Sequence, residues 1–455
     1  MKPNSFSLFS SIPLGKEYTA LLDPETLFWI TSKNSKIEEA AEMLKNLYTE
    51  KLKKNLEEGR DFLNTSIALD MVELHPTEMC NLNCNYCYIP PHMRKKDKIM
   101  SVEEIEIILN TILEYLDDDP TKGMKRVIFH GGEPLIAKDQ IFEIIDRYYK
   151  DIELGIQTNG TLMTQDDADF LKTRNIHVSF SIDGPPQEAH DALRQYWNER
   201  GTFQDVVETI SYFNNYFWMG VIVTISKFNV SYICDIARAL HKMGVPSSIF
   251  NPISPSNDRA VAFMPDIAEL SKNYRKLVDT VLELNKENNQ RFVVDNIESI
   301  VMSLLTSNMR VLYCDMSPCG AGRLVVVITS NGDVYPGSEF VGSREFLSGN
   351  IFRNTLEEIF ESSPCTYLRS RSVNKIPECV NCPYKYICGA NCPAAVYHLE
   401  KTLFKKSPYC QFKKELIDYI FYKIADTGLE GAMQLVSNSF EEVLQKSEKL
   451  VHVSR

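Results

Sequence analysis

The 455-residue sequence has no apolar run approaching the roughly 18 residues that a membrane-spanning helix needs. Its first residues, MKPNSFSLFSSIPLGKEY, lack the apolar core of a signal peptide. The sequence also lacks an excess of basic residues, because its net charge is −12 and a nucleic-acid partner normally requires a basic face. These absences argue against membrane and nucleic-acid partners and predict a cytoplasmic protein.

What the sequence does have is a globular composition and many cysteines. Hydrophobic residues make up 44% and charged residues 24%, a balance that excludes wholesale disorder. The chain holds 12 cysteines. In a small secreted protein they would indicate disulfides, but here the chain is long and the cysteines are bunched at short spacings. In a reducing compartment this pattern indicates metal binding.

Short apolar strands alternate with helical stretches from about residue 68 onward. The predicted strands cover residues 71–75, 126–130, 154–157, 177–182, 220–225 and 247–250. Repeated strand–helix units predict an α/β fold with a parallel sheet, open or closed into a barrel. The active residues of such folds gather at the carboxyl ends of the strands.

Before this region, a strand, a turn and a strand are predicted around Asp23-Pro-Glu-Thr, followed by a helix capped by Ser35. After it, the alternation stops and cysteines become dense. We therefore expect five segments: 1–65, a small α+β element; 68–265, the core; 266–310, a helical linker; 311–425, a cysteine-rich domain; and 426–455, a helical tail.

Cys80, Cys84 and Cys87 follow the first strand of the alternating region. Three thiolates from one loop can hold three corners of a four-iron cluster and leave the fourth iron open. The alternatives are three unrelated thiols or a zinc loop, for which His92 could supply the fourth ligand. The spacing favours the cluster over zinc.

The segment Cys80-Asn-Leu-Asn-Cys84-Asn-Tyr86-Cys87 resembles the signature loop of radical S-adenosylmethionine enzymes, including the aromatic residue before the last cysteine. Further matching motifs follow at successive strand ends: Gly131-Gly-Glu-Pro134, Gln157-Thr-Asn-Gly160, Ser181-Ile-Asp-Gly-Pro185, His190-Asp-Ala-Leu-Arg194 and Arg200-Gly-Thr-Phe203. The resemblance covers about residues 70–255 and implies a partial (β/α)6 TIM-like barrel with an S-adenosylmethionine site.

The resemblance also implies roles for these motifs. Gly131, Gly132, Glu133 and Pro134 would form the turn that holds the cationic amine of S-adenosylmethionine, with Glu133 as an acceptor. Ser181 and an arginine, Arg194 or Arg200, would hold its carboxylate. Asn159 or Asp183 would meet the ribose, and Tyr86 belongs to the same site. The alternative for Asn159-Gly160 and Asp183-Gly184 is that they are ordinary turn pairs.

A second cysteine array lies near the C-terminus. By its spacing alone it fits a zinc knuckle or a ferredoxin-like site. Together with a radical core it resembles the SPASM domain, whose relatives hold two auxiliary four-iron clusters. The resemblance assigns the first auxiliary cluster to Cys314, Cys319 and Cys392. It assigns the second to Cys379, Cys382, Cys388 and Cys410.

The array departs from the SPASM pattern at one position. A cysteine should end the Gly-x4-Cys motif that begins at Gly332, but Gly337 stands there. Either the first auxiliary cluster keeps an open iron that binds a substrate cysteine, or Glu339, Cys365 or water completes it, or the chain holds one auxiliary cluster rather than two. Cys234 and Cys365 fit no motif and are expected to be small buried apolar residues.

The resemblance implies an enzyme that cleaves S-adenosylmethionine with one electron, from a donor such as flavodoxin or ferredoxin, to form a 5′-deoxyadenosyl radical. SPASM relatives mostly modify peptides, and the N-terminal element resembles a shortened leader-peptide recognition element. Three hypotheses stay open: a ribosomal-peptide maturase forming a thioether or other cross-link, a formylglycine-forming sulfatase maturase, and a non-catalytic iron–sulfur or zinc protein. No catalytic base can be named.

Overall fold

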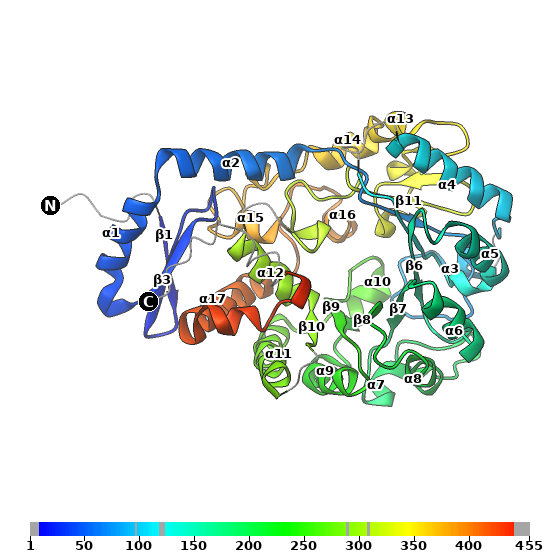
Figure 1. Cartoon of the computed structure of the whole chain (residues 1–455), viewed down its shortest axis with the longest axis horizontal. Helices are drawn as coiled ribbons and strands as arrows, with labels where there is room; N and C mark the ends of the chain where they lie inside the picture. Colours follow the sequence, from blue (N-terminus) through cyan, green and yellow to red (C-terminus); the bar gives the residue numbers. More distant parts are fainter. Residues whose placement is uncertain (1–8, 96–97, 118–122, 288–290, 307–309, 441–455) are drawn as a thin grey trace.

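The computed structural model describes residues 9–95, 98–117, 123–287, 291–306 and 310–440. Its main feature is a twisted sheet whose central strands are parallel and follow one another in chain order (Figure 1). These strands are β4 (Met71–Leu74), β5 (Arg126–Phe129), β6 (Glu153–Thr158), β7 (His177–Ser181), β8 (Met219–Ile225) and β9 (Ser247–Pro252). All six predicted strands of the alternating region are present, and the predicted parallel α/β barrel is confirmed.

Helices follow the strands, and the longer ones cover the outer face of the sheet (Figure 1). They are α3 (Pro91–Lys95), α4 (Val102–Asp117), α5 (Lys138–Tyr148), α6 (Gln165–Thr173), α7 (Gln187–Asp191), α8 (Phe203–Ser211), α9 (Ile233–Lys242), α10 (Asp258–Ala262) and α11 (Ile267–Glu287). Because side chains alternate across a strand, one face of each strand is apolar and packs on these helices. In β4, for example, Val72 and Leu74 belong to the main core.

The sheet continues into the cysteine-rich region, which the sequence did not predict. β10 (Val293–Val294) extends it beside β9. At the other side β11 (Val325–Ile328) pairs in parallel with β4, and β12 (Asp333–Tyr335) and β13 (Gly349–Asn350) add antiparallel strands. The barrel and the cysteine-rich region are therefore joined by main-chain hydrogen bonds rather than by a linker alone.

The helices of the C-terminal half surround this extension. They are α12 (Asp295–Leu305), α13 (Leu356–Phe360), α14 (Ser363–Arg369), α15 (Lys385–Cys388), α16 (Pro393–Glu400) and α17 (Cys410–Met433). Helix α17 runs through residue 426, where a separate tail was expected to begin, and is kinked at Gly428. Residues 441–455 of that tail lie outside the described part. Among the described residues, no helix combines the length and the apolarity needed to cross a membrane.

A small antiparallel sheet precedes the barrel (Figure 1). It contains β1 (Ser10–Leu14), β2 (Tyr18–Leu22) and β3 (Trp29–Lys33), followed by α1 (Ile37–Leu47) and α2 (Glu50–Thr65). The predicted strand–turn–strand and helix are present, with an additional strand in front. The predicted cap is wrong, because Ser35 lies in a short 3₁₀ turn (Asn34–Lys36) and the helix begins at Ile37 without a side-chain cap. Trp29 is buried in the main core, and its Nε1 donates to the main-chain oxygen of Leu304 at 2.7 Å, so this sheet packs firmly on the rest of the chain.

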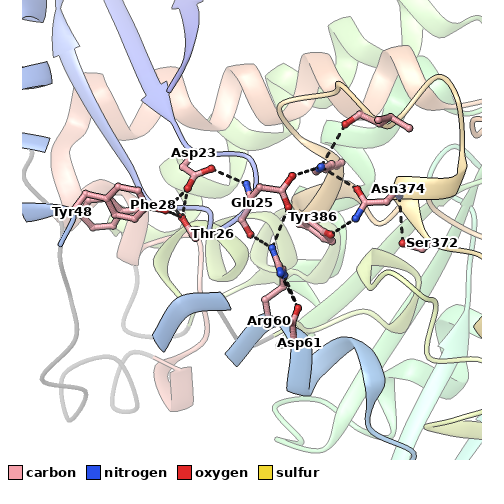
Figure 2. Close-up of polar contacts among 12 residues, drawn as sticks. Asp23, Glu25, Thr26, Phe28, Tyr48, Arg60, Asp61, Ser372, Asn374 and Tyr386 are labelled. Carbon is pink, nitrogen blue, oxygen red and sulfur yellow. Dashed lines mark hydrogen bonds and ion pairs between the residues drawn. The ribbon is translucent and has the colours of Figure 1, made fainter. Parts of the chain in front are cut away.

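A polar junction ties the turn between β2 and β3 to the cysteine-rich region (Figure 2). Arg60 of α2 donates to the main-chain oxygen of Glu25 at 2.7 Å and to its carboxylate at 3.1 Å. The same carboxylate accepts from the buried Lys385 of α15, which also donates to Asn374 at 3.0 Å. A buried ammonium needs such partners, so the junction fixes how the N-terminal sheet meets α15.

Candidate functional site

A cavity of about 390 Å³ lies at the carboxyl ends of the barrel strands. This volume lies within the range of small-molecule sites. Its wall includes polar side chains at or just after strand ends, among them His130, Gln157, Ser181, Thr224 and Asn251. Their positions follow from alternation, because the residues next to them in the strands pack outward on the helices.

The loop after β4 places Cys80, Cys84 and Cys87 on the cavity wall. The loop is held from both sides: Trp197 Nε1 donates to the main-chain oxygen of Cys80 at 2.9 Å, and the buried Arg94 donates to that of Ile89 at 3.1 Å. Burial raises the pKa of all three thiols, that of Cys84 to about 11. Converging buried thiols of this kind ionise when they bind a metal, so the donor set suits an iron–sulfur cluster.

The glycine-rich turn after β5 packs directly against the segment that leads into the cysteine loop. A Cβ on Gly131 would lie 2.5 Å from the main-chain oxygen of Thr77, and one on Gly132 would lie 2.2 Å from that of Glu78. Gly131 also has a φ of +109°, which side chains rarely tolerate. Only glycine fits at both positions, and the turn thereby presents its main chain to the cavity. This cradle fits the small polar end of a ligand such as S-adenosylmethionine.

Glu133 braces this turn from inside the protein. Its carboxylate accepts from Leu135 N at 3.1 Å, from Thr158 Oγ1 at 2.6 Å and from Asn159 N at 2.8 Å. Pro134, also buried, begins the short helix behind it. The sequence predicted that Glu133 accepts from the ligand amine. In the structure its carboxylate accepts from three protein donors, and Gly131 and Gly132 line the cavity instead of Glu133.

Asp183 likewise acts as an internal anchor. It is fully buried and accepts from Arg194 Nε at 2.6 Å, Tyr86 Oη at 2.8 Å and Thr224 N at 2.7 Å. Arg194 and Tyr86 themselves line the cavity, whereas Asp183 does not. The structure therefore places Asp183 behind the cavity wall, where it positions Arg194 and Tyr86, and its ribose contact stays a prediction.

The structure separates the two candidate arginines. Arg194 is buried and lines the cavity, as Ser181 does. Arg200 lies at the surface, where 60% of its side chain is exposed, and pairs with Asp205 at 2.8 Å. Only Arg194 is in place to meet a bound carboxylate.

Asn159, the other candidate for the ribose, does line the cavity. Its Nδ2 donates to Asn81 Oδ1 at 2.9 Å and lies 3.9 Å from Cys80 Sγ, and its Oδ1 accepts from Thr161 Oγ1 at 2.7 Å. The side chain thus links the end of β6 to the cysteine loop. Asn159-Gly160 therefore forms a turn, and Asn159 also lines the cavity.

Cysteines of the C-terminal array open on the same cavity. Cys314 and Cys392 line it. The thiols of Cys319 and Cys392 both lie close enough to the thiol of Cys314 to perturb its pKa. Hydrogen bonding with these two thiols and burial raise that pKa. The carboxylate of Glu339 lies at the same point, with Oε2 3.8 Å from Cys392 Sγ. The cavity therefore runs from the first cysteine motif to this second group.

The remaining predicted cysteines form a third group away from the cavity wall. Cys379 and Cys382 interact electrostatically with each other and with Cys410, which also affects Cys388. Burial raises the pKa of Cys379 to about 11 and that of Cys388 to about 12. The thiols thus gather as a set of four, as a cluster would require.

Arg371 lies between the second and third groups. Its buried guanidinium donates to the main-chain oxygens of Leu403, Ala390 and Asn391, and thiols of both groups act on its charge. Burial lowers the pKa of Arg371. A cation held there would balance the negative charge of bound clusters. No sequence motif indicated this role for Arg371.

Three other candidates lie elsewhere. His92 is exposed on α3 and is not among the residues that line the cavity. Cys365 is fully buried, and its thiol donates to Ser348 Oγ at 3.4 Å. Cys234, on α9, is half-buried with its thiol 4.0 Å from the main-chain oxygen of Asn273.

Sequence reasoning missed a polar cluster inside the barrel. Potential ligand atoms of Glu73, His75 and His130 lie within 4.8 Å of one another. His130 Nε2 is 2.8 Å from Gln157 Nε2, and its Nδ1 is 3.5 Å from Glu73. The signal was available: Glu73 and His75 occupy the alternate positions of a strand whose other residues are apolar. This cluster places an acid–base side chain, His130, on the cavity wall.

Comparisons with known proteins agree with this geometry. Residues 74–240 match the radical SAM superfamily, and residues 319–383 match the SPASM iron–sulfur cluster-binding domain. An uncharacterized protein of Archaeoglobus fulgidus is 34% identical over 405 residues, which span 88% of this chain and 90% of the relative. A cysteine-type anaerobic sulfatase-maturating enzyme of Clostridium novyi is 27% identical over 340 residues, 71% of this chain and 88% of the relative.

Solved structures share the fold. Native anSMEcpe with bound AdoMet and the Cp18Cys peptide superimposes with a TM-score of 0.66 at 21% identity, covering 79% of this chain and 99% of that one. Streptococcus suis SuiB bound to its precursor peptide SuiA superimposes with a TM-score of 0.60 at 17% identity, covering 90% and 99%.

Proposed function

Because this chain belongs to the radical S-adenosylmethionine superfamily and carries a SPASM domain, we propose that it modifies a cysteine-bearing peptide, forming a thioether or another cross-link. Its cofactors are S-adenosylmethionine, the radical SAM [4Fe–4S] cluster and auxiliary iron–sulfur clusters. When bound, these groups supply the electron transfer and the carbon radical that removes hydrogen from an unactivated carbon. The chain supplies their ligands, the orientation of the substrate and the exclusion of water.

The proposal assigns each cysteine group to one cluster. Cys80, Cys84 and Cys87 hold the cluster that binds S-adenosylmethionine. Cys314, Cys319 and Cys392 hold the first auxiliary cluster, and Cys379, Cys382, Cys388 and Cys410 hold the second. Around S-adenosylmethionine, the main chain of Gly131 and Gly132, Asn159, Ser181 and Arg194 are the groups in place to make polar contacts.

The observation that carries the proposal is the shared cavity. Cys80, Cys84 and Cys87 open on it from one side, and Cys314 and Cys392 from the other. A substrate in this cavity would lie between the source of the radical and an auxiliary cluster. Forming a carbon–sulfur bond from a C–H and an S–H group removes a hydrogen atom, a proton and an electron. S-adenosylmethionine held at the first cluster site would supply the group that takes up the hydrogen atom, a cluster held by Cys314 and Cys392 would take up the electron, and His130 on the cavity wall would accept the proton.

A second candidate is formylglycine formation on a target protein. The specific observation in its favour is the similarity to sulfatase-maturating enzymes over 71% of this chain. Both reactions use the same cavity, so the fold does not separate them. The fate of the substrate sulfur separates the two reactions, because a thioether keeps the sulfur and formylglycine formation from cysteine loses it.

The decisive experiment is co-expression of the enzyme with a candidate cysteine-bearing peptide, followed by mass spectrometry. Loss of two hydrogens with retention of sulfur supports the cross-link. Replacement of the cysteine sulfur by oxygen together with the loss of two hydrogens supports formylglycine. An unmodified peptide, together with a lack of deoxyadenosine formation by the iron-replete enzyme, would contradict both.

We also propose that the N-terminal sheet binds a leader segment of the substrate by strand addition. In the described part of the chain, its end strands β1 and β3 each have one strand partner, so one edge of each is not paired with another strand. Pro13 removes one main-chain donor from β1, which favours β3 as the docking edge. Amide hydrogen exchange with a precursor peptide should slow in Trp29–Lys33, and the same peptide without its leader should have no such effect.

A further inference from the structure

The corner of the first auxiliary site that lacks a cysteine contains a carboxylate. Glu339 lies two residues after Gly337, in a short helical turn covering Ser338–Phe340. Its Oε2 is 3.8 Å from Cys392 Sγ and accepts a hydrogen bond from Ser254 Oγ at 2.5 Å. Glu339 lines the cavity together with Cys314 and Cys392. The side chain is therefore held, by a residue of the barrel, at the point where the thiols converge.

Gly337 itself is not required by the backbone. Its φ of −169° is extended and open to any residue. A Cβ added there would make ordinary contacts, 3.5 Å to Ala321 Cβ and 3.8 Å to Phe340 Cδ2. The position could therefore accept a cysteine, and its glycine means that the fourth ligand must come from another residue or from solvent.

The other protein candidates are poorly placed. The thiol of Cys365 donates to Ser348 and has Arg369 and Glu361 as its charged neighbours rather than the thiols of the site. It is absent from the cavity wall. His398 contacts the main-chain oxygen of Glu339 at 3.3 Å, which points its imidazole at the backbone of this turn.

The charge of Glu339 also needs a partner. Its carboxylate contacts a hydroxyl and a thiol, both neutral groups. The residue is partly buried, and its one other charged neighbour is the imidazole of His398. A partly buried carboxylate is favoured when it pairs with a cation or coordinates a metal. An iron ion at the convergence point of the three thiols would supply that positive charge.

We propose that Glu339 is the fourth protein ligand of the first auxiliary cluster, beside Cys314, Cys319 and Cys392. Carboxylate oxygen is a harder ligand than thiolate and holds iron–sulfur clusters less tightly. The iron bound to Glu339 would therefore differ electronically from the three iron ions bound to cysteine. The proposal rests on the cluster assignment made under the proposed function, but not on the identity of the substrate.

The test is spectroscopy of the enzyme reconstituted with iron and sulfide under anaerobic conditions, without substrate. Mössbauer spectra of the wild type should contain two iron sites unlike the thiolate-bound sites, one at the open corner of the first cluster and one at Glu339. Glu339→Gln should lose one iron atom per chain and should, on mild oxidation, give a stronger three-iron electron paramagnetic resonance signal than the wild type treated in the same way. Glu339→Cys should restore the iron and leave only the distinct site of the first cluster. The matched control is Glu345→Gln, a nearby surface glutamate bonded to Tyr397, which should match the wild type.

Two results would overturn the proposal. One is a Glu339→Gln enzyme with the iron content and spectra of the wild type. The other is a Cys365→Ser enzyme that loses the iron atom instead. Cys314→Ala tests the cluster assignment separately from the role of Glu339. If that variant keeps all its iron, the site holds no cluster and the assignment of Cys314, Cys319 and Cys392 is wrong.

Discussion

Arg194 Nε donates to Asp183 Oδ2 at 2.6 Å in an ion pair that is almost completely buried. The pair stands behind the cavity, with Asp183 also fixing Tyr86 of the cysteine loop. It therefore links the end of β7 to the loop after β4, and the orientation of Arg194 toward a ligand depends on it. A second arginine–aspartate pair, Arg200–Asp205, is exposed and provides a natural comparison.

Arg194→Gln should weaken S-adenosylmethionine binding at least tenfold, about 1.4 kcal/mol, because the variant loses the cation at the cavity. It should also destabilise the fold by about 3–5 kcal/mol, since Asp183 is left buried without its partner. Calorimetric titration and urea unfolding measure the two effects. Arg200→Gln should change stability by at most about 1 kcal/mol and leave binding unchanged. Equal effects of the two substitutions would contradict the assignment of Arg194.

The stability of the fold should depend on the protonation of His190. Its Nδ1 accepts from Asp183 N at 3.0 Å, its Nε2 is 2.9 Å from Thr202 Oγ1, and burial lowers its pKa to about 4. The unfolded chain binds this proton near pH 6.5. Between pH 6.5 and 4 the unfolded state therefore binds more protons than the folded state, and stability falls as the pH falls, by roughly 3 kcal/mol in total.

Urea unfolding at a series of pH values measures this dependence. His190→Gln keeps a neutral acceptor and donor at the position and should flatten the pH profile over the same window. Profiles of wild type and variant that run parallel would show that another group is responsible.

The cysteine groups should be separable by substitution. Replacing Cys80, Cys84 and Cys87 with alanine should abolish deoxyadenosine formation under strong reductant and leave the auxiliary iron in place, because the three thiols lie apart from the C-terminal groups. Replacing Cys379, Cys382 and Cys388 should remove auxiliary iron but spare some cleavage of S-adenosylmethionine. Chromatography and iron analysis provide the readouts. Cys234→Ala should match the wild type in both. Continued cleavage by the first triple variant would refute the assignment.

The junction of Glu25 and Lys385 should control how tightly the N-terminal sheet is held. Glu25→Gln leaves the buried Lys385 with its neutral partners Asn374 and Val380. Because the Glu25 side chain is half exposed, we expect a loss of about 1 kcal/mol or less. Hydrogen exchange should quicken in β2 and β3 but not in the barrel strands. Glu58→Gln, which breaks the exposed pair with Lys54, is the control and should leave exchange unchanged.

The six parallel strands were predictable because each is a short apolar run between helical patterns, and their polar ends mark the site. β10 and β13 have two residues each and give no periodic signal. β11 is apolar on both faces because it is covered on both, and its place beside β4 depends on a pairing distant in sequence. Strand order of this kind is a tertiary property that local patterns do not encode.

The site residues were likewise predictable only in part. Motifs identified the strand ends at which Gly131, Asn159, Ser181 and Arg194 lie, but not which side chains face the cavity. Glu133 and Asp183 turn inward because nearby main-chain N–H groups need acceptors once they are buried. The position of Glu339 beside Cys392 is set by Ser254 of the barrel, a contact between segments far apart in the chain.

The pairing of β4 with β11 also bears on the order of events during synthesis. β4 is made early and finds its neighbour β5 soon afterward, but its other edge stays open until β11 emerges from the ribosome. An exposed strand edge invites pairing with other chains. Because the three cysteines of the first cluster loop directly follow β4, nascent chains would carry unprotected thiols beside an open edge. Shielding by a chaperone or rapid translation through the barrel would therefore matter more for this protein than for a barrel that closes before its C-terminal domain is made.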